Sequence, residues 1–153
     1  MLRRSEGMYG AGTAIHVMLH DVLTQDLRTL IERGLDQHAE EHNVPPRNAK
    51  SLVVSASVNG TDVAGALSAK TFWTCLAIDL MWVQPALRCT GVGRTILTRA
   101  ENEARKRGCV IAVVDTASFQ APGFYMSCGY VEAFRIPDVP PGRARIYLTK
   151  RLA

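Results

Sequence analysis

The sequence predicts an α/β (α+β) fold, a single domain in which a mixed sheet is flanked by helices. Its 153 residues suit one ordinary domain. Apolar residues make up 47% of the chain and charged residues 21%, which is enough for a packed core. Segments with strand-like and helix-like apolar periodicity alternate, and a strand–helix–strand unit over 76–116 requires two parallel strands.

The charge and cysteine patterns exclude several classes of protein. There are 18 Lys and Arg against 14 Asp and Glu, a net charge of +4 without the basic stripe of a nucleic-acid binder. A small anionic ligand such as a phosphorylated cofactor remains compatible with that charge. No apolar segment approaches the roughly 18 residues that would predict a membrane span. The four cysteines form no C-x-x-C pair, so we expect neither zinc nor disulfides, and a cytoplasmic location.

The N-terminal region is expected to hold a tail, a strand and a helix. Residues 1–12 lack an apolar signal segment and predict a flexible tail, with a single domain over 13–153. An apolar, β-rich run predicts a first strand over 13–22. A helix is expected over 24–42, because apolar residues recur there at the spacing of one helical face. These residues are Leu27, Leu30, Ile31, Leu35 and Ala39.

The rest of the chain predicts a hairpin, the strand–helix–strand unit and a second hairpin. Asn59-Gly60 is a strong turn signal, because both residues tolerate positive φ. Strands are expected over 51–58, 62–69, 76–83, 109–116, 130–136 and 144–150. Helices are expected over 93–107 and 121–128. The first of these helices has an apolar stripe of Ile96, Leu97, Ala100 and Ala104.

The loop between the strand at 76–83 and the next helix indicates an anion site. Gly91 and Gly93 allow a tight turn and a close approach of ligand to backbone. The helix start presents unpaired N–H groups, and Arg88 and Arg94 would form charged rims around a bound diphosphate. The alternative interpretation is a simple turn and helix start. G-x-G-x-x-G and G-K-[ST] are both absent, which excludes a dinucleotide fingerprint and a Walker loop.

Two motifs in the chain resemble those of the GCN5-related N-acetyltransferase (GNAT) superfamily. Arg88-x-x-Gly91-x-Gly93 is similar to its R/Q-x-x-G-x-G/A signature. The segment from Ala121 through Tyr125 to Tyr130 resembles its A-x-x-x-Y-x-x-x-G-F/Y motif. The order of elements also matches over residues 13–152. Cys89 stands where many members have Gly, and Ser118 stands where many have Asn.

The resemblance implies a mostly antiparallel sheet, splayed between the strands at 76–83 and 109–116, with acetyl-CoA bound where they part. The pantetheine amides would pair with backbone near Trp82–Gln84, and an N–H near Val83 would polarise the thioester carbonyl. The cofactor-binding residues implied are Trp82, Val83, Gln84, Arg88, Cys89, Thr90, Gly91, Val92, Gly93, Arg94, Ser118, Ala121 and Tyr125.

Three residues are candidates for proton transfer. An alkyl amine is protonated at pH 7 and must lose a proton before it attacks a thioester. Asp79 is the first candidate base, because it is the only charge in an apolar strand and is expected to be desolvated; a carboxylate that caps N–H groups is the alternative. Asp115, at the end of its strand, is the second. The resemblance gives Tyr125 the role of proton donor to the leaving thiolate; a core aromatic is the alternative.

The acceptor site is less defined. Asp36, Glu40 and Glu41 would suit a polycationic amine or simply form a solvated helix face. Phe72 and Trp73 would line the acceptor pocket or pack in the core, and Asp79 and Asp115 would contact the acceptor as well. His38 and His42 stand four residues apart on a helix without a third ligand at suggestive spacing, so no metal site is predicted.

The resemblance implies an acetyl-CoA-dependent N-acetyltransferase that acts on a primary amine of a small molecule by direct transfer in a ternary complex. Residues 115–121 resemble those of one bacterial GNAT subgroup. This similarity favours an aminosugar or aminoglycoside antibiotic, including the kasugamycin type, as the substrate. Alternatives are a protein acetyltransferase for lysine or N-terminal amines and a non-catalytic acyl-CoA-binding regulatory module. We expect a homodimer, with no nucleic-acid or membrane partner.

Overall fold

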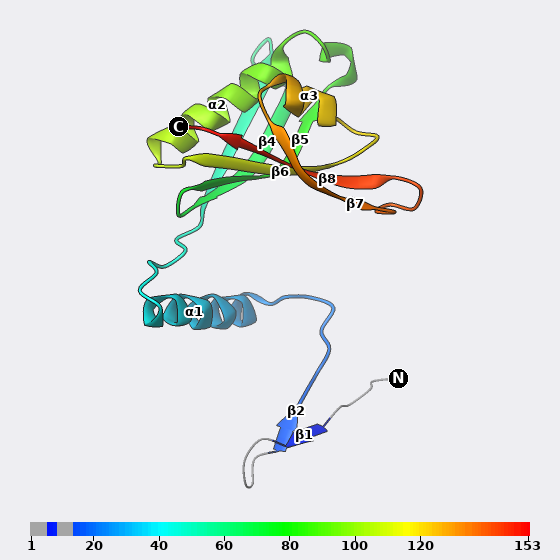
Figure 1. Ribbon diagram of the computed structural model, residues 1–153. Helices are drawn as coiled ribbons and strands as arrows, with labels where there is room; N and C mark the ends of the chain where they lie inside the picture. Colours follow the sequence, from blue (N-terminus) through cyan, green and yellow to red (C-terminus); the bar gives the residue numbers. More distant parts are fainter. Residues whose placement is uncertain (1–5, 9–13) are drawn as a thin grey trace. The chain divides into compact units, whose positions relative to one another are not determined.

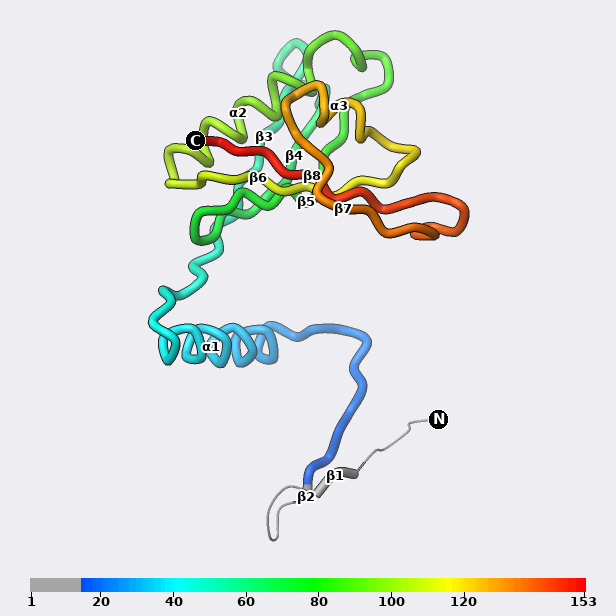
Figure 2. Tube along the Cα trace, viewed as in Figure 1, coloured from blue at the N-terminus to red at the C-terminus, as the bar shows by residue number. Residues whose placement is uncertain are grey.

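The computed structural model describes residues 6–8 and 14–153. The chain divides into two compact units, Met1–Pro46 and Arg47–Ala153 (Figures 1 and 2). The larger unit contains the sheet and both motifs, so it is the unit that carries the candidate site.

The N-terminal unit contains a short hairpin and a helix. Strand β1 (Glu6–Met8) pairs antiparallel with β2 (Ala14–His16). The strand predicted over 13–22 is therefore wrong beyond His16, because residues 17–24 have no partner strand in the described chain and form no regular structure. Within the predicted tail, Glu6–Met8 forms a strand, and the remaining tail residues lie outside the described ones.

Helix α1 (Gln25–Glu41) confirms the predicted helix. Its N-cap is Thr24, whose Oγ1 accepts a hydrogen bond from the amide of Leu27 at 3.3 Å. Gly34 does not interrupt it. No residue of α1 is buried, so the described part of this unit does not bury the apolar face that the spacing predicts.

The C-terminal unit is a six-stranded sheet in the order β3-β4-β5-β6-β8-β7. Its strands are β3 (Lys50–Val58), β4 (Asp62–Phe72), β5 (Cys75–Val83), β6 (Ile111–Ala117), β7 (Val131–Pro137) and β8 (Ala144–Arg151). Only β5 and β6 are parallel, as the strand–helix–strand unit predicts. The turn between β3 and β4 uses positive φ at Asn59 (52°) and Gly60 (78°), which confirms the hairpin.

Two helices and the sheet share one hydrophobic core. Helix α2 (Val92–Lys106) follows a short 3-10 turn, η1 (Pro85–Leu87), and α3 (Pro122–Ser127) follows β6. All four residues of the predicted apolar stripe of α2 are buried. They pack with sheet residues such as Leu67, Leu76 and Leu148 and with Tyr125 of α3. The core thus fixes α2 against β3, β4 and β5, and α3 against β7 (Figure 1).

Candidate active site

The central parallel strands part after four residue pairs. The pairing runs from Cys75 with Ile111 to Ile78 with Val114 and then stops. Beyond that point β5 is paired only with β4, and β6 only with β8. The predicted splay is confirmed, and it leaves the edge of β5 over residues 79–83 without a strand partner on the β6 side.

A β-bulge at Asp79 marks the start of this divergence. Ser68 of β4 pairs with Leu80 and Ala69 pairs with Ile78, so Asp79 is the extra residue in β5. A bulge bends a strand and increases its local twist. The one charged residue of β5 therefore lies where the strand turns away from β6.

The loop from Arg88 to Gly91 forms the predicted cradle of main-chain amides. Cys89 has φ of 62° and Gly91 has φ of 97°, so the chain turns twice through the left-handed region before α2 begins. The amides of Cys89, Thr90 and Gly91 donate to no acceptor within the described residues. The Thr90 hydroxyl donates to the carbonyl of Leu87 at 2.7 Å, and Arg88 Nε donates to that of Val83 at 3.2 Å. Free amides at a helix start fit an anionic ligand.

Gly91 at the end of the loop and Gly93 at the start of α2 have different structural roles. A Cβ on Gly91 would meet nothing within 4 Å, so this residue is needed for its φ and leaves the loop open. A Cβ on Gly93 would lie 3.3 Å from the Phe124 ring and 3.4 Å from Val83 Cγ2. Gly93 therefore permits close packing of α2 against α3 and the end of β5.

Tyr125 lies on α3 and is buried, with 6% of its surface exposed. Its hydroxyl donates to the sulfur of Met81, a weak acceptor, at 3.7 Å. Burial raises the pKa of Tyr125 to about 12, with smaller contributions from Cys128 and Asp115. Full proton transfer to a thiolate, whose acid has a pKa of about 8.5, would then cost about 5 kcal/mol. Because burial disfavours the phenolate, the hydroxyl is suited to donating a hydrogen bond to developing charge on sulfur.

The two candidate bases differ in their partners. Asp115 Oδ2 accepts a hydrogen bond from Arg145 Nε, an ion pair between β6 and β8. Asp79 has no hydrogen bond or ion pair within the described residues, and its side chain is exposed in its unit. Within the C-terminal unit Asp79 is therefore not desolvated, because it is the extra residue of the bulge and its side chain is left uncovered there.

Residues between β6 and α3 form hydrogen bonds that fix the end of β6 and link this segment to β8. The Ser118 hydroxyl accepts from the amide of Ala144 at 3.1 Å, which ties it to the start of β8. Gln120 Oε1 accepts from the amide of Ala117 at 3.0 Å and closes the end of β6. Ala121 is the N-cap residue of α3. Met81 and Arg145 are not predicted from sequence, since their partners lie in segments that only the fold brings together. Gln120 is also not predicted, although its partner Ala117 is only three residues away.

The predicted acceptor residues lie in different parts of the chain: Asp79 and Asp115 come directly after the last paired residues of β5 and β6, whereas the others do not. Asp36, Glu40 and Glu41 belong to α1 in the N-terminal unit, and their role stays a prediction. Phe72 ends β4 and pairs with Cys75, at the start of β5, with Trp73 directly after it. The register places both aromatic residues at the opposite end of β5 from the cradle, so a place beside the acetyl site is wrong for them. Trp82 lies near the cradle and is 50% exposed.

The described residues contain no group of three or more His, Cys, Asp or Glu side chains that could hold a metal ion. The rings of His38 and His42 lie with centroids 4.4 Å apart, and His38 Nδ1 is 3.6 Å from a carboxylate oxygen of Glu41. No helix in the described chain is long and apolar enough to cross a membrane.

Comparison with known proteins identifies the family. A sequence model of the acetyltransferase (GNAT) family matches residues 18–130, a range that includes the divergence, the cradle and Tyr125. The chain therefore belongs to the GNAT family and is an acetyltransferase.

Individual relatives agree with this assignment. The chain is 44% identical over 92 residues to blasticidin-S acetyltransferase of Streptomyces morookaense, covering 60% of this chain and 68% of that one. The crystal structure of an acetyltransferase from Agrobacterium tumefaciens aligns with a TM-score of 0.77 at 26% identity, covering 90% and 99% of the two chains. An aminoglycoside 6′-N-acetyltransferase in complex with coenzyme A has the same fold, with a TM-score of 0.61 at 15% identity. The alignment covers 88% of this chain and 95% of that one.

Proposed function

We propose that this acetyltransferase uses acetyl-CoA to acetylate a primary amine of a small-molecule antibiotic, by direct transfer within a ternary complex. One observation carries the proposal. The strand edge of β5 that loses its partner leads directly into a loop of free main-chain amides. An extended chain of amides that ends in a diphosphate is the ligand that such an edge and loop can pair with.

Residues of this chain fit the cofactor at two places. The amides from Cys89 to Gly93 would hold the diphosphate, with Arg88 beside them. The free edge over Trp82–Gln84 would pair with the pantetheine amides, although the amide of Gln84 is already bonded to the carbonyl of Ala64 at 2.9 Å. Acetyl-CoA, when bound, supplies an acetyl thioester whose transfer to nitrogen releases a thiol.

Proton transfer is assigned to two side chains. Asp79 accepts the proton of the substrate ammonium, directly or through water, because its carboxylate is free whereas that of Asp115 is paired with Arg145. Tyr125 donates a hydrogen bond to the departing sulfur, because its buried hydroxyl has only the weak acceptor Met81.

The substrate class rests on sequence similarity. The relative at 44% identity is named for blasticidin S, whereas the aminoglycoside enzymes share only the fold at 14–19% identity. Blasticidin S is therefore the first substrate to test, ahead of the aminosugars favoured by the sequence alone.

Thiol release from acetyl-CoA should be measured for the purified chain with blasticidin S, kasugamycin, other aminoglycosides and a lysine peptide, beside calorimetry with coenzyme A. We expect release with at least one antibiotic. Release with the peptide alone would identify a protein acetyltransferase. Binding of coenzyme A without release across a broad amine panel would indicate a regulatory module, and absence of binding would overturn the proposal.

We also propose that the protein is a homodimer. Strand β7 is at the edge of the sheet, and all seven of its residues are exposed, including Val131, Phe134 and Ile136. Exposed apolar side chains on an edge strand favour pairing with a second strand. Light scattering should give twice the mass of the chain; a monomer mass at 100 µM would contradict this.

A further inference from the structure

Arg94 contacts the helix that carries Tyr125. It is the third residue of α2, and its Nη2 donates to the carbonyl oxygen of Ser127 at 3.2 Å and to the Ser127 hydroxyl at 3.3 Å. Ser127 is the last residue of α3. We propose that Arg94 is a positioning residue, which holds α3 against the cradle and so places the Tyr125 hydroxyl for the reaction.

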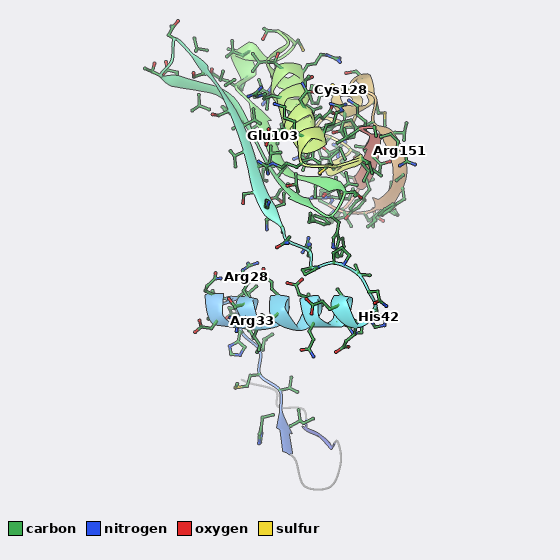
Figure 3. The ribbon with its side chains drawn as sticks, turned by 90° about the vertical axis from the view of Figure 1, so that its left-hand side faces the viewer. Arg28, Arg33, His42, Glu103, Cys128 and Arg151 are labelled. Atoms are coloured by element: carbon green, nitrogen blue, oxygen red, sulfur yellow. The ribbon has the colours of Figure 1, made fainter. Side chains whose placement is uncertain are left out.

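The contact satisfies a group that α3 itself leaves open. The last carbonyls of a helix have no partner within it. Here Tyr125 and Met126 accept from the amides of Cys128 and Gly129, at 2.9 and 3.0 Å, in the turn that follows (Figure 3 labels Cys128). The carbonyl of Ser127 accepts from Arg94 instead. A cation at a helix C-terminus is also favoured by the helix dipole.

The same junction is closed by packing. The ring of Phe124 lies against Gly93, so close that an added Cβ would be 3.3 Å from it and the ring would have to shift slightly. Adjacent residues of α2, Gly93 and Arg94, therefore contact the residues on either side of Tyr125 in α3. Since α3 has only six residues, these two contacts from α2 add to its packing against β7 in holding it in place.

This arrangement assigns Arg94 a different role from the phosphate rim that the sequence suggests. A guanidinium that binds phosphate would mainly set the affinity for the cofactor. A guanidinium that holds α3 would mainly set the turnover rate through Tyr125. The expected effect on turnover rests on the proposed function. The expected effect on the position of α3 rests only on the Arg94–Ser127 contact, so the two effects can be tested separately.

The kinetic test compares Arg94→Gln with Arg99→Gln, an exposed arginine of the same helix that has no partner within the described residues. We expect Arg94→Gln to lower kcat about tenfold, with KM for acetyl-CoA within about twofold of the parent. The kcat of Arg94→Lys should lie between those of Arg94→Gln and the parent, and the kcat of Arg99→Gln should equal that of the parent. In a Tyr125→Phe background, Arg94→Gln should lower kcat less than twofold further. An increase in KM at unchanged kcat, or a full additional loss in that background, would overturn the proposal.

The structural test uses ligand-free protein. Hydrogen exchange at the amides of residues 125–130 should be at least fivefold faster in Arg94→Gln than in Arg99→Gln, while the second half of α2 exchanges equally in both. Unchanged exchange over 125–130 would overturn the proposal even if turnover falls. If the parent chain transfers no acetyl group, the proposed function fails, and this exchange result still decides whether Arg94 holds α3.

Discussion

The hydroxyl of Tyr125 on α3 lies 3.7 Å from the sulfur of Met81 on β5. Met81 follows the point where β5 loses its parallel partner, so the contact places the phenol beside the free edge of the strand. The only hydrogen-bond partner of the Tyr125 hydroxyl within the described residues is thus a weak acceptor, which a stronger acceptor could replace. This relationship makes the role of Tyr125 accessible to simple substitutions.

Tyr125→Phe should lower kcat by about 100-fold, because loss of a positioned proton or hydrogen-bond donor has effects of that order. KM for acetyl-CoA should change little, since the cradle amides are untouched. The thermal midpoint should also stay close to that of the parent, because the bond to sulfur is weak. Steady-state thiol release and a melting curve test this, and an unchanged rate would remove Tyr125 from the mechanism.

The stability of the chain should fall in alkali because of Tyr125. Burial raises its pKa to about 12 in the folded state, from about 10 unfolded. The folded state therefore holds the proton more tightly, and this stabilisation is complete below pH 10 and lost as the pH rises to 12, up to about 3 kcal/mol. Urea unfolding at pH 8, 10 and 11 should show a steeper decline for the parent than for Tyr125→Phe. If the free energy of unfolding falls equally with pH in both proteins, the pKa of Tyr125 is not raised.

Asp79→Asn should lower kcat/KM about 100-fold at pH 7, where the acceptor amine is protonated. The loss should shrink toward pH 10, because the amine then deprotonates without a base. Glu103→Gln on α2 is the matched control and should be silent in this assay. If the loss in Asp79→Asn is the same at every pH, the carboxylate does not act as the base.

Gly91→Ala should weaken coenzyme A binding about tenfold, because an alanine at φ of 97° is strained and the loop would relax away from its present shape. Gly34→Ala in α1 is the control: its Cβ would meet nothing within 4 Å, its φ is not positive, and alanine favours a helix. Calorimetry should find unchanged binding for Gly34→Ala. Equal affinities for both variants would show that the loop conformation is not needed.

Glu101→Gln should destabilise the fold without affecting KM. Glu101 is 3% exposed and accepts two hydrogen bonds from Lys150 Nζ, at 2.9 and 2.7 Å. Removing one member of a buried pair costs about 3 kcal/mol. Glu103→Gln, which breaks an exposed pair with Arg107, should cost less than about 1 kcal/mol (Figure 3). Urea unfolding compares the two, and similar losses would mean that burial at Glu101 contributes nothing.

The sequence predicts the parts of this fold that depend on local periodicity. The strands of the C-terminal unit, α2 with its apolar stripe, and the tight turn at Gly91 all follow from patterns a few residues long. The strand over 13–22 is predicted wrongly, because an apolar run forms a strand only where a partner is available. The contacts of Asp115 with Arg145 and of Arg94 with Ser127 join residues 30 and 33 positions apart, and no local signal marks them.

The bulge at Asp79 decides which side chains of β5 meet the tyrosine. In a regular strand Ile78 would share its face with Leu80 and Trp82. One inserted residue reverses that alternation, so Met81 and Val83 point the same way as Ile78, toward the helices. Deleting Asp79 would consequently remove both the carboxylate and the bulge: Leu80 would follow Ile78 directly, and regular alternation would keep Met81 and Val83 on the face of Ile78, with the thioether still beneath the phenol.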